Sequence, residues 1–259
     1  MTARVVFFLV GVALVVSVVA CGGPGAQARP VELTVSAASH LAFAFQELGG
    51  QFEQATGVAV RYNFGATGVL AQQIEQGAPV DVFAAAHIAF VEPLVAQGLL
   101  VPDTVAVYGV GYLVLWQPEG APVQVGSLDD LARLEVQRVA IANPDYAPYG
   151  QAAREALRSA GLWELISPKL IVGASVRQAL QYAEAGHADV ALVALPLAVG
   201  AGGRWVSVPQ ELYTPLKPAL AVVASSPAQA AAREFVRFVV GPRGRAVLQE
   251  YGVLPEEIP

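Results

Sequence analysis

The chain of 259 residues has few of the features on which many functional sites depend. Cys21 is its only cysteine, which excludes an intrachain disulfide and a cysteine-based zinc site. Lysine occurs only at Lys169 and Lys217, so no basic patch is available to attract anions at long range. The one long apolar run without charge is residues 5–20, which is short for a membrane-spanning helix. A bundle of transmembrane helices is therefore excluded.

The overall composition is that of a folded protein with a large core. Hydrophobic residues make up 55% of the chain and charged residues only 14%, which argues against disorder. The 25 glycines and 18 prolines argue against a coiled coil. The length exceeds the usual size of one hydrophobic core, so we expect two compact units.

The N-terminus has the pattern of an export signal. Arg4 precedes the apolar run, and Cys21 follows directly after its small last residue. We therefore predict a lipoprotein signal peptide over residues 1–20, lipidation of Cys21 and a flexible tether over residues 21–30. The alternative is a plain secretory signal with an incidental cysteine. Without residues 1–20 the formal charge changes from −6 to −7, and we expect an extracytoplasmic, lipid-anchored protein that binds no nucleic acid.

From residue 31 onward, short β-branched runs alternate with amphipathic helical stretches. This alternation predicts an α/β fold of parallel strands joined by crossover helices. The predicted strands are residues 33–37, 58–63, 80–84, 107–116, 139–142, 170–172, 189–193, 205–208 and 220–223. The predicted helices are residues 41–57, 67–77, 87–98, a short one from 127, 150–160, one from 176, 226–241 and a last one through 248–251.

Two places in the pattern indicate that the chain crosses between lobes. Gly109 and Gly111 interrupt the apolar strand 107–116 and allow the backbone to bend there. A return crossing is expected near Pro218. The prediction is a two-lobed fold with a cleft, in which lobe I comprises residues 31–109 and 219–259 and lobe II residues 110–218.

Several strands end where small polar or glycine-containing segments open a helix. These segments are residues 36–40, 64–68, 148–150 and 173–176. Helix N-termini present unpaired N–H groups and a partial positive charge, so several of them together could bind an anion without Lys or Arg. Ser39 and Thr67 would add hydroxyl donors. Taken singly, each of these residues is an ordinary helix cap, and only their convergence would make a site.

Enzyme signatures are missing from the sequence. It has no Gly-x-Ser-x-Gly elbow, no phosphate-binding Gly-x-x-x-x-Gly-Lys-Ser/Thr loop and no Gly-x-Gly-x-x-Gly. His40, His87 and His187 lack metal-ligand spacing, and the Asp129–Asp130 pair belongs to a capping box. We expect neither catalysis nor a directly bound metal ion.

The chain resembles the periplasmic molybdate-binding proteins of ABC uptake systems from about residue 31 to residue 255. The matching pieces are residues 37–39, 64–74, 77–83 (GAPVDVF), 113–116 (LVLW), 141–144 (IANP), 147–150 (APYG), 167–170 (SPKL), 175–176 and 251–252. The resemblance implies a two-lobed type II binding-protein fold with molybdate or tungstate as cargo. It also implies an ABC permease as partner, a monomer and no cofactor.

The resemblance also implies a set of oxyanion-binding positions. They fall on Ser39, His40, Thr67, Tyr149 and Val176. Many members of that family place a tyrosine at the end of the strand that follows Asp189, where this chain has Ala194. The resemblance implies that Tyr149 supplies the tyrosine instead.

The chemistry of the cargo is consistent with a site made of neutral donors. Molybdate is a full dianion at neutral pH, whereas phosphate still carries a proton and needs an acceptor. Sulfate must be rejected by cavity size, because donors placed for the larger ion are too distant from the smaller one. Two alternatives stay open: the same fold with sulfate, another oxyanion or a ferric complex as cargo, or an extracytoplasmic enzyme on this scaffold.

Overall fold

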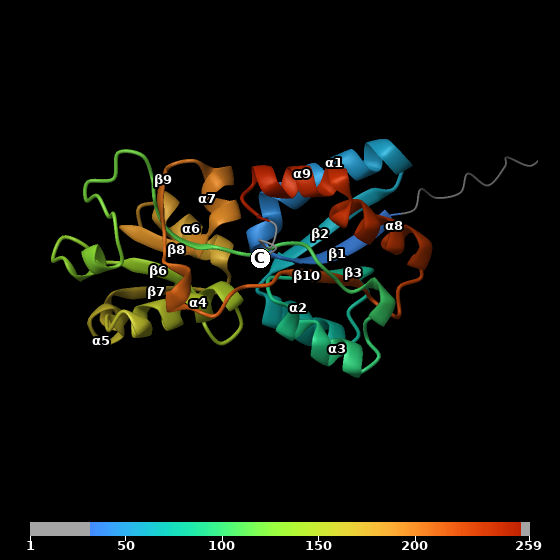
Figure 1. Cartoon of the computed structure of the whole chain (residues 1–259), viewed down its shortest axis with the longest axis horizontal. Helices are drawn as coiled ribbons and strands as arrows, with labels where there is room; N and C mark the ends of the chain where they lie inside the picture. The colour runs from blue at the N-terminus through green and yellow to red at the C-terminus, as the bar shows by residue number, and fades with distance from the viewer. Residues whose placement is uncertain (1–31, 255–259) are drawn as a thin grey trace, which may run out of the picture.

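The computed structural model describes residues 32–254 and arranges them in two α/β lobes that lie side by side (Figure 1). Each lobe contains a five-stranded sheet with helices on both faces. The predicted two-lobed α/β fold is confirmed. The predicted signal peptide, lipidation site Cys21 and tether lie outside the described residues.

Lobe I is built around the sheet β2-β1-β3-β10-β4. Helices α1, α8 and α9 cover one face of this sheet and α2 and α3 the other (Figure 1). The strands are β1 (Glu32–Ala38), β2 (Ala59–Gly65), β3 (Val82–Ala85), β4 (Ala106–Val107) and β10 (Ala219–Val222). The helices are η1 (Ser39–Leu41), α1 (Ala42–Thr56), α2 (Thr67–Glu75), η2 (Ile88–Phe90), α3 (Glu92–Ala96), η3 (Pro102–Thr104), α8 (Gln229–Val240) and α9 (Pro242–Glu250).

Lobe II is built around the sheet β7-β6-β8-β5-β9. Helices α6 and α7 lie on one side of the sheet and α4 and α5 on the other (Figure 1). The strands are β5 (Leu113–Gln117), β6 (Val139–Ala142), β7 (Leu170–Gly173), β8 (Val190–Ala194) and β9 (Arg204–Ser207). The helices are η4 (Asp129–Ala132), α4 (Pro148–Ser159), α5 (Trp163–Ile166), η5 (Ser167–Lys169), α6 (Val176–Glu184), α7 (Leu195–Ala201) and η6 (Gln210–Leu212).

Both sheets are mixed, whereas the sequence pattern predicted parallel strands. Strand β1 is parallel to β2 and β3, and β6 is parallel to β7 and β8. Strand β10 runs antiparallel to β3 and β4, and β5 runs antiparallel to β8 and β9. The antiparallel strands β5 and β10 are those that the chain enters after crossing from the other lobe, so they do not follow a crossover helix.

The crossing divides the segment that was predicted as one strand over residues 107–116. Strand β4 ends at Val107 in lobe I and β5 begins at Leu113 in lobe II. Between them, Val110 N–H donates to Leu254 O at 2.8 Å and Gly111 N–H donates to Leu216 O at 2.9 Å. The outward, return and C-terminal segments are thus hydrogen-bonded to one another between the lobes.

Several helix boundaries differ from the sequence prediction. The helix predicted over residues 87–98 is divided into η2 and α3, because Pro93 in the first turn of α3 lacks an N–H and restarts the helix. The helix predicted from Ser226 begins at Gln229, because the Ser226 Oγ accepts a hydrogen bond from Ala228 N–H at 3.1 Å in a turn that precedes the helix. Helix α4 begins at Pro148 rather than Gly150. Helices α5 and α7 were not predicted.

Candidate functional site

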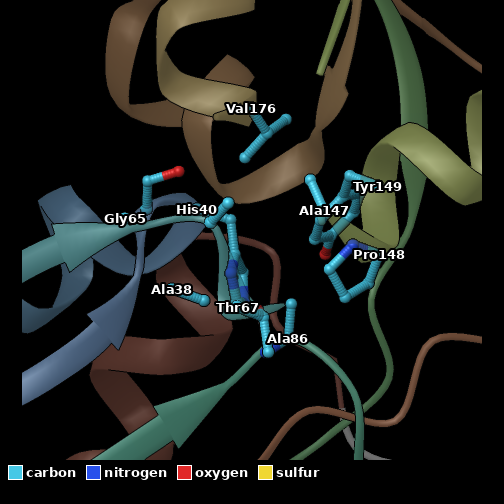
Figure 2. A pocket seen from close by; sticks show the side chains of 11 residues that line it. Ala38, His40, Gly65, Thr67, Ala86, Ala147, Pro148, Tyr149 and Val176 are labelled. Atoms are coloured by element: carbon cyan, nitrogen blue, oxygen red, sulfur yellow. The ribbon is translucent and has the colours of Figure 1, made fainter. Parts of the chain in front are cut away.

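A small pocket lies between the two lobes (Figure 2). Its cavity volume is about 10 Å³, which is room for about one water-sized molecule. Pockets for drug-sized ligands hold about 300–1,000 Å³, so this one suits a compact solute. Its lining residues are Ala38, Ser39, His40, Gly65, Ala66, Thr67, Ala86, Ala147, Pro148, Tyr149 and Val176.

The pocket lies at the carboxyl ends of parallel strands in both lobes. In lobe I, β1 ends at Ala38, β2 at Gly65 and β3 at Ala85, and the residues that follow each strand line the pocket. In lobe II, β6 and β7 precede the segments that carry Tyr149 and Val176. Ligands of open α/β sheets bind at this edge, because the loops that leave the strands meet there.

All the residues predicted to bind an oxyanion line this one pocket. They come from different elements: Ser39 and His40 from η1, Thr67 from α2, Tyr149 from α4 and Val176 from α6. Each is almost completely buried. The pocket lining contains no Asp, Glu, Lys or Arg.

The sequence suggested that Thr67 could cap a helix, but its side chain does not cap α2. Helix α2 begins at Thr67 itself, and the Thr67 Oγ1 accepts a hydrogen bond from Ala86 N–H at 3.1 Å. Because that contact uses an oxygen lone pair, the hydroxyl hydrogen stays available to a ligand. The Ala86 amide therefore orients Thr67 as a donor.

The lobes touch each other around the pocket. Arg177 N–H of α6 donates to Ser39 Oγ at 3.4 Å, and the Arg177 guanidinium lies 5.0 Å from the centre of the Phe43 ring. On the other side, Gly68 N–H donates to Tyr146 O at 2.8 Å. These contacts join lobe I to lobe II, so the pocket is closed in this structure.

Helix N-termini of lobe II face the pocket. Helix α4 starts at Pro148, and its N-cap residue Ala147 offers no side-chain oxygen, so the first N–H groups of the helix lack a capping partner. Helix α6 is capped by Ser175, whose hydroxyl accepts from Gln178 N–H at 3.3 Å. The Val176 amide is left free of that cap. Both helix ends add partial positive charge at the pocket.

The phenol of Tyr149 points toward the crossing between the lobes. A Cβ built on Gly111 would overlap the Tyr149 hydroxyl, and Gly111 does not line the pocket. Burial raises the pKa of Tyr149, so the phenol stays protonated. The part of Tyr149 best placed as a pocket donor is therefore its backbone N–H in the first turn of α4.

His40 is a buried imidazole without a hydrogen bond on either nitrogen. Its side chain extends between Ala38 and Thr67 (Figure 2), and its ring centre lies 5.2 Å from that of Tyr149. Burial lowers the pKa of His40 from 6.5 to about 3, so the imidazole is neutral in this structure. A neutral imidazole has one N–H donor to offer to an anion.

Comparison with known proteins assigns the chain to a family. The sequence profile of the bacterial extracellular solute-binding proteins matches residues 33–254. The chain belongs to this solute-binding family. The molybdate-binding protein ModA of Rhodobacter capsulatus is 35% identical over 87% of this chain and 89% of its own length. The ModA protein of Azotobacter vinelandii is 34% identical over 93% of this chain and 95% of its own.

Solved structures give the same family and the same fold. The periplasmic molybdate-binding protein of Azotobacter vinelandii superposes on this solute-binding protein with a TM-score of 0.81 at 31% identity, covering 86% of this chain and 100% of the other. The sulfate-binding protein SubI of Mycobacterium tuberculosis reaches a TM-score of 0.73 at 19% identity over 88% of each chain. The SubI match supports the two-lobed fold alone.

The sequence analysis missed the small residues of the pocket. The lining also contains Ala86 and Ala147, which were not predicted as site residues. Each lies just after a strand or just before a helix, which is the signal that could have found them. Between residues 32 and 254, no helix is long and apolar enough to span a bilayer, and no group of three or more His, Cys, Asp or Glu side chains could hold a metal ion.

Proposed function

We propose that this solute-binding protein captures molybdate or tungstate in the pocket between its lobes. The observation that carries the proposal is that the pocket gathers hydroxyl and amide donors from both lobes without one formally charged side chain. The molybdate-binding relatives, with 34–35% identity over most of the chain, support the same cargo. A dianion with no proton to donate is the ligand that a donor-only site favours.

The proposed ligands of the oxyanion are Ser39, His40, Thr67, Tyr149 and Val176. Ser39 and Thr67 contribute hydroxyl groups, Tyr149 and Val176 contribute backbone N–H groups, and His40 contributes a ring N–H. Each charge-assisted hydrogen bond contributes about 1.5–3 kcal/mol, so several of them can offset the loss of hydration of the anion. Sulfate is disfavoured because its oxygens lie closer to its centre than those of molybdate, which leaves fixed donors too far away.

The two lobes close on the anion by rotation about the crossing. We propose lobe I as residues 31–109 and 219–259 and lobe II as residues 110–218. The closed protein then delivers its cargo to the membrane subunits of an ABC permease. We also propose that residues 1–20 are a signal peptide, that Cys21 carries a lipid anchor on an otherwise monomeric extracytoplasmic protein, and that the protein has no catalytic activity and needs no cofactor.

Titration calorimetry on residues 22–259 tests the proposed cargo. Molybdate and tungstate are expected to bind tightly, with sulfate and phosphate far weaker. Thr67→Ala should weaken molybdate binding about tenfold or more, because one charge-assisted hydrogen bond is lost. Thr67→Ser keeps the hydroxyl and is the matched control, expected to stay close to the wild-type affinity. Equal affinity for sulfate and molybdate, or no effect of Thr67→Ala, would contradict the proposal.

A further inference from the structure

His40 is an exception to the rule that buried polar groups have partners. Within residues 32–254, the buried side-chain atoms without a hydrogen bond are both ring nitrogens of His40 and the Tyr62 hydroxyl. Of these, only His40 lines the pocket, with 1% of its surface exposed. Leaving such a group unpaired is costly, so its retention points to a ligand that satisfies it.

Apart from His40, no side chain that lines the pocket carries or can gain a positive charge near neutral pH. Tyr149 of α4 is in ring contact with His40. Burial raises the pKa of Tyr149 and of Tyr108, which interacts with Tyr149, so both phenols are neutral. The guanidinium of Arg177 on α6 lies over the Phe43 ring. His87, beyond β3, accepts from Ala89 N–H through its Nδ1. Neither α7 nor the pocket lining contains another group that titrates.

Given the proposed function, we propose that His40 takes up one proton when a tetrahedral dianion binds. The imidazole is the only pocket side chain that can become a cation near neutral pH. The proton leaves hydronium or the acid form of the buffer, which becomes water or the conjugate base, and bonds to the lone pair of the ring nitrogen that carries no hydrogen. The closed complex then carries one unit of excess negative charge instead of two.

The balance of two effects favours this proton uptake. Burial disfavours imidazolium, since it lowers the His40 pKa from 6.5 to about 3, which is a factor of about 3,000 in the protonation equilibrium. A dianion about 5 Å away, at an effective dielectric constant of about 20, favours imidazolium by a factor of roughly 70,000. The attraction exceeds the penalty, and His40 in the complex is mostly protonated at neutral pH.

The same balance between burial and attraction lets His40 distinguish dianions from monoanions. A tetrahedral monoanion at the same distance supplies half the attraction, a factor of only roughly 300, which is less than the burial penalty. The imidazole therefore stays neutral beside a monoanion. His40 would thus favour dianions over monoanions of similar shape, a discrimination that hydrogen-bond donors alone provide more weakly.

Proton uptake also determines how the affinity for the anion changes with pH. The complex binds one more proton than the free protein, so affinity must rise as pH falls. At pH values between the His40 pKa of the free protein and that of the complex, each unit rise in pH lowers the affinity about tenfold. A donor-only site would show the same molybdate affinity across this range, because the ligand is already fully deprotonated.

Calorimetry of molybdate binding in two buffers of different ionisation enthalpy counts the protons taken up. Near pH 6.5 we expect about one proton per molybdate for the wild type and about none for His40→Asn, which keeps a side-chain N–H donor but cannot ionise. From about pH 6.5 to about pH 8, wild-type affinity should fall about tenfold or more while that of His40→Asn stays level. Perchlorate, a tetrahedral monoanion, should bind without proton uptake.

The outcomes separate this inference from the proposed function. Tight molybdate binding by the wild type with no proton uptake overturns the role of His40 and leaves the cargo in place. No binding of molybdate or tungstate overturns the cargo itself. If His40→Asn does not fold, which its thermal melting shows, the wild-type proton count and the perchlorate measurement still decide the question.

Discussion

Closure of the lobes can be weakened without touching a ligand-binding side chain. Gly68 lies in the first turn of α2, and its N–H donates to Tyr146 O of lobe II at 2.8 Å. A Cβ on Gly68 would lie 2.9 Å from that carbonyl oxygen, 3.2 Å from Tyr146 Cα and 3.3 Å from the Phe90 ring. Two of these atoms belong to the backbone of the opposite lobe, which cannot yield as a flexible side chain would. Gly68→Ala therefore holds the lobes apart.

The expected loss of affinity follows from the contacts that close the pocket. The hydrogen bond from Gly68 is worth about 1 kcal/mol, and forcing a methyl group into a filled space costs about 1–3 kcal/mol. Together these predict that molybdate binds Gly68→Ala about 30- to 1,000-fold more weakly. The variant should not be less stable without ligand, since Ala favours a helix over Gly by about 1 kcal/mol.

The matched control is Gly50→Ala. Gly50 lies within α1, and a Cβ there would have no atom within 4 Å. It should gain the same helix stabilisation and bind molybdate as the wild type does. Calorimetry gives the affinities and thermal melting without ligand gives the stabilities. If Gly68→Ala binds molybdate as tightly as Gly50→Ala, the contact between Gly68 and Tyr146 does not belong to the ligand-bound state, and the reasoning fails.

Two further predictions concern stability and location. Asp81 accepts Thr34 N–H at 2.7 Å and the Ser226 hydroxyl at 2.5 Å, so Asp81→Ala should lower the free energy of unfolding in urea by about 3 kcal/mol. An unchanged free energy of unfolding would show that these hydrogen bonds make no net contribution to stability. Cys21→Ser should move the full-length protein from the membrane fraction to the soluble extracytoplasmic fraction of a bacterial host, and continued membrane association would refute lipid anchoring.

The fold could be predicted because its signals are local. Apolar spacing located α1, and the β-branched runs located β1, β6 and β8 close to their observed bounds. The order of the strands in the sheets was harder to predict, because β10 pairs with β3 across more than a hundred intervening residues and enters the sheet from the crossing. The short helix α7 was missed, since its sequence from Leu195 to Ala201 is apolar on every side and has no helical period.

The site was predicted through resemblance as much as through residue chemistry. The positions Ser39, His40, Thr67, Tyr149 and Val176 do lie around one pocket, while their contacts with an anion stay predictions. The sequence did not indicate how the side chains of the site are oriented. The contact of the Tyr149 hydroxyl with the crossing at Gly111 and the lack of any partner for His40 depend on packing between segments far apart in the chain.

The small residues of the pocket suit the backbone donors that we propose for it. A backbone N–H reaches a ligand only where no bulky side chain stands between them, and the lining accordingly contains Ala38, Gly65, Ala66, Ala86 and Ala147. Such residues carry no chemical signature, so a site of this kind is nearly invisible to a search for charged or nucleophilic side chains. In the proposed site, selectivity would depend on how firmly the donors are held, and the hydrogen bond from Ala86 N–H to Thr67 Oγ1 fixes one of them.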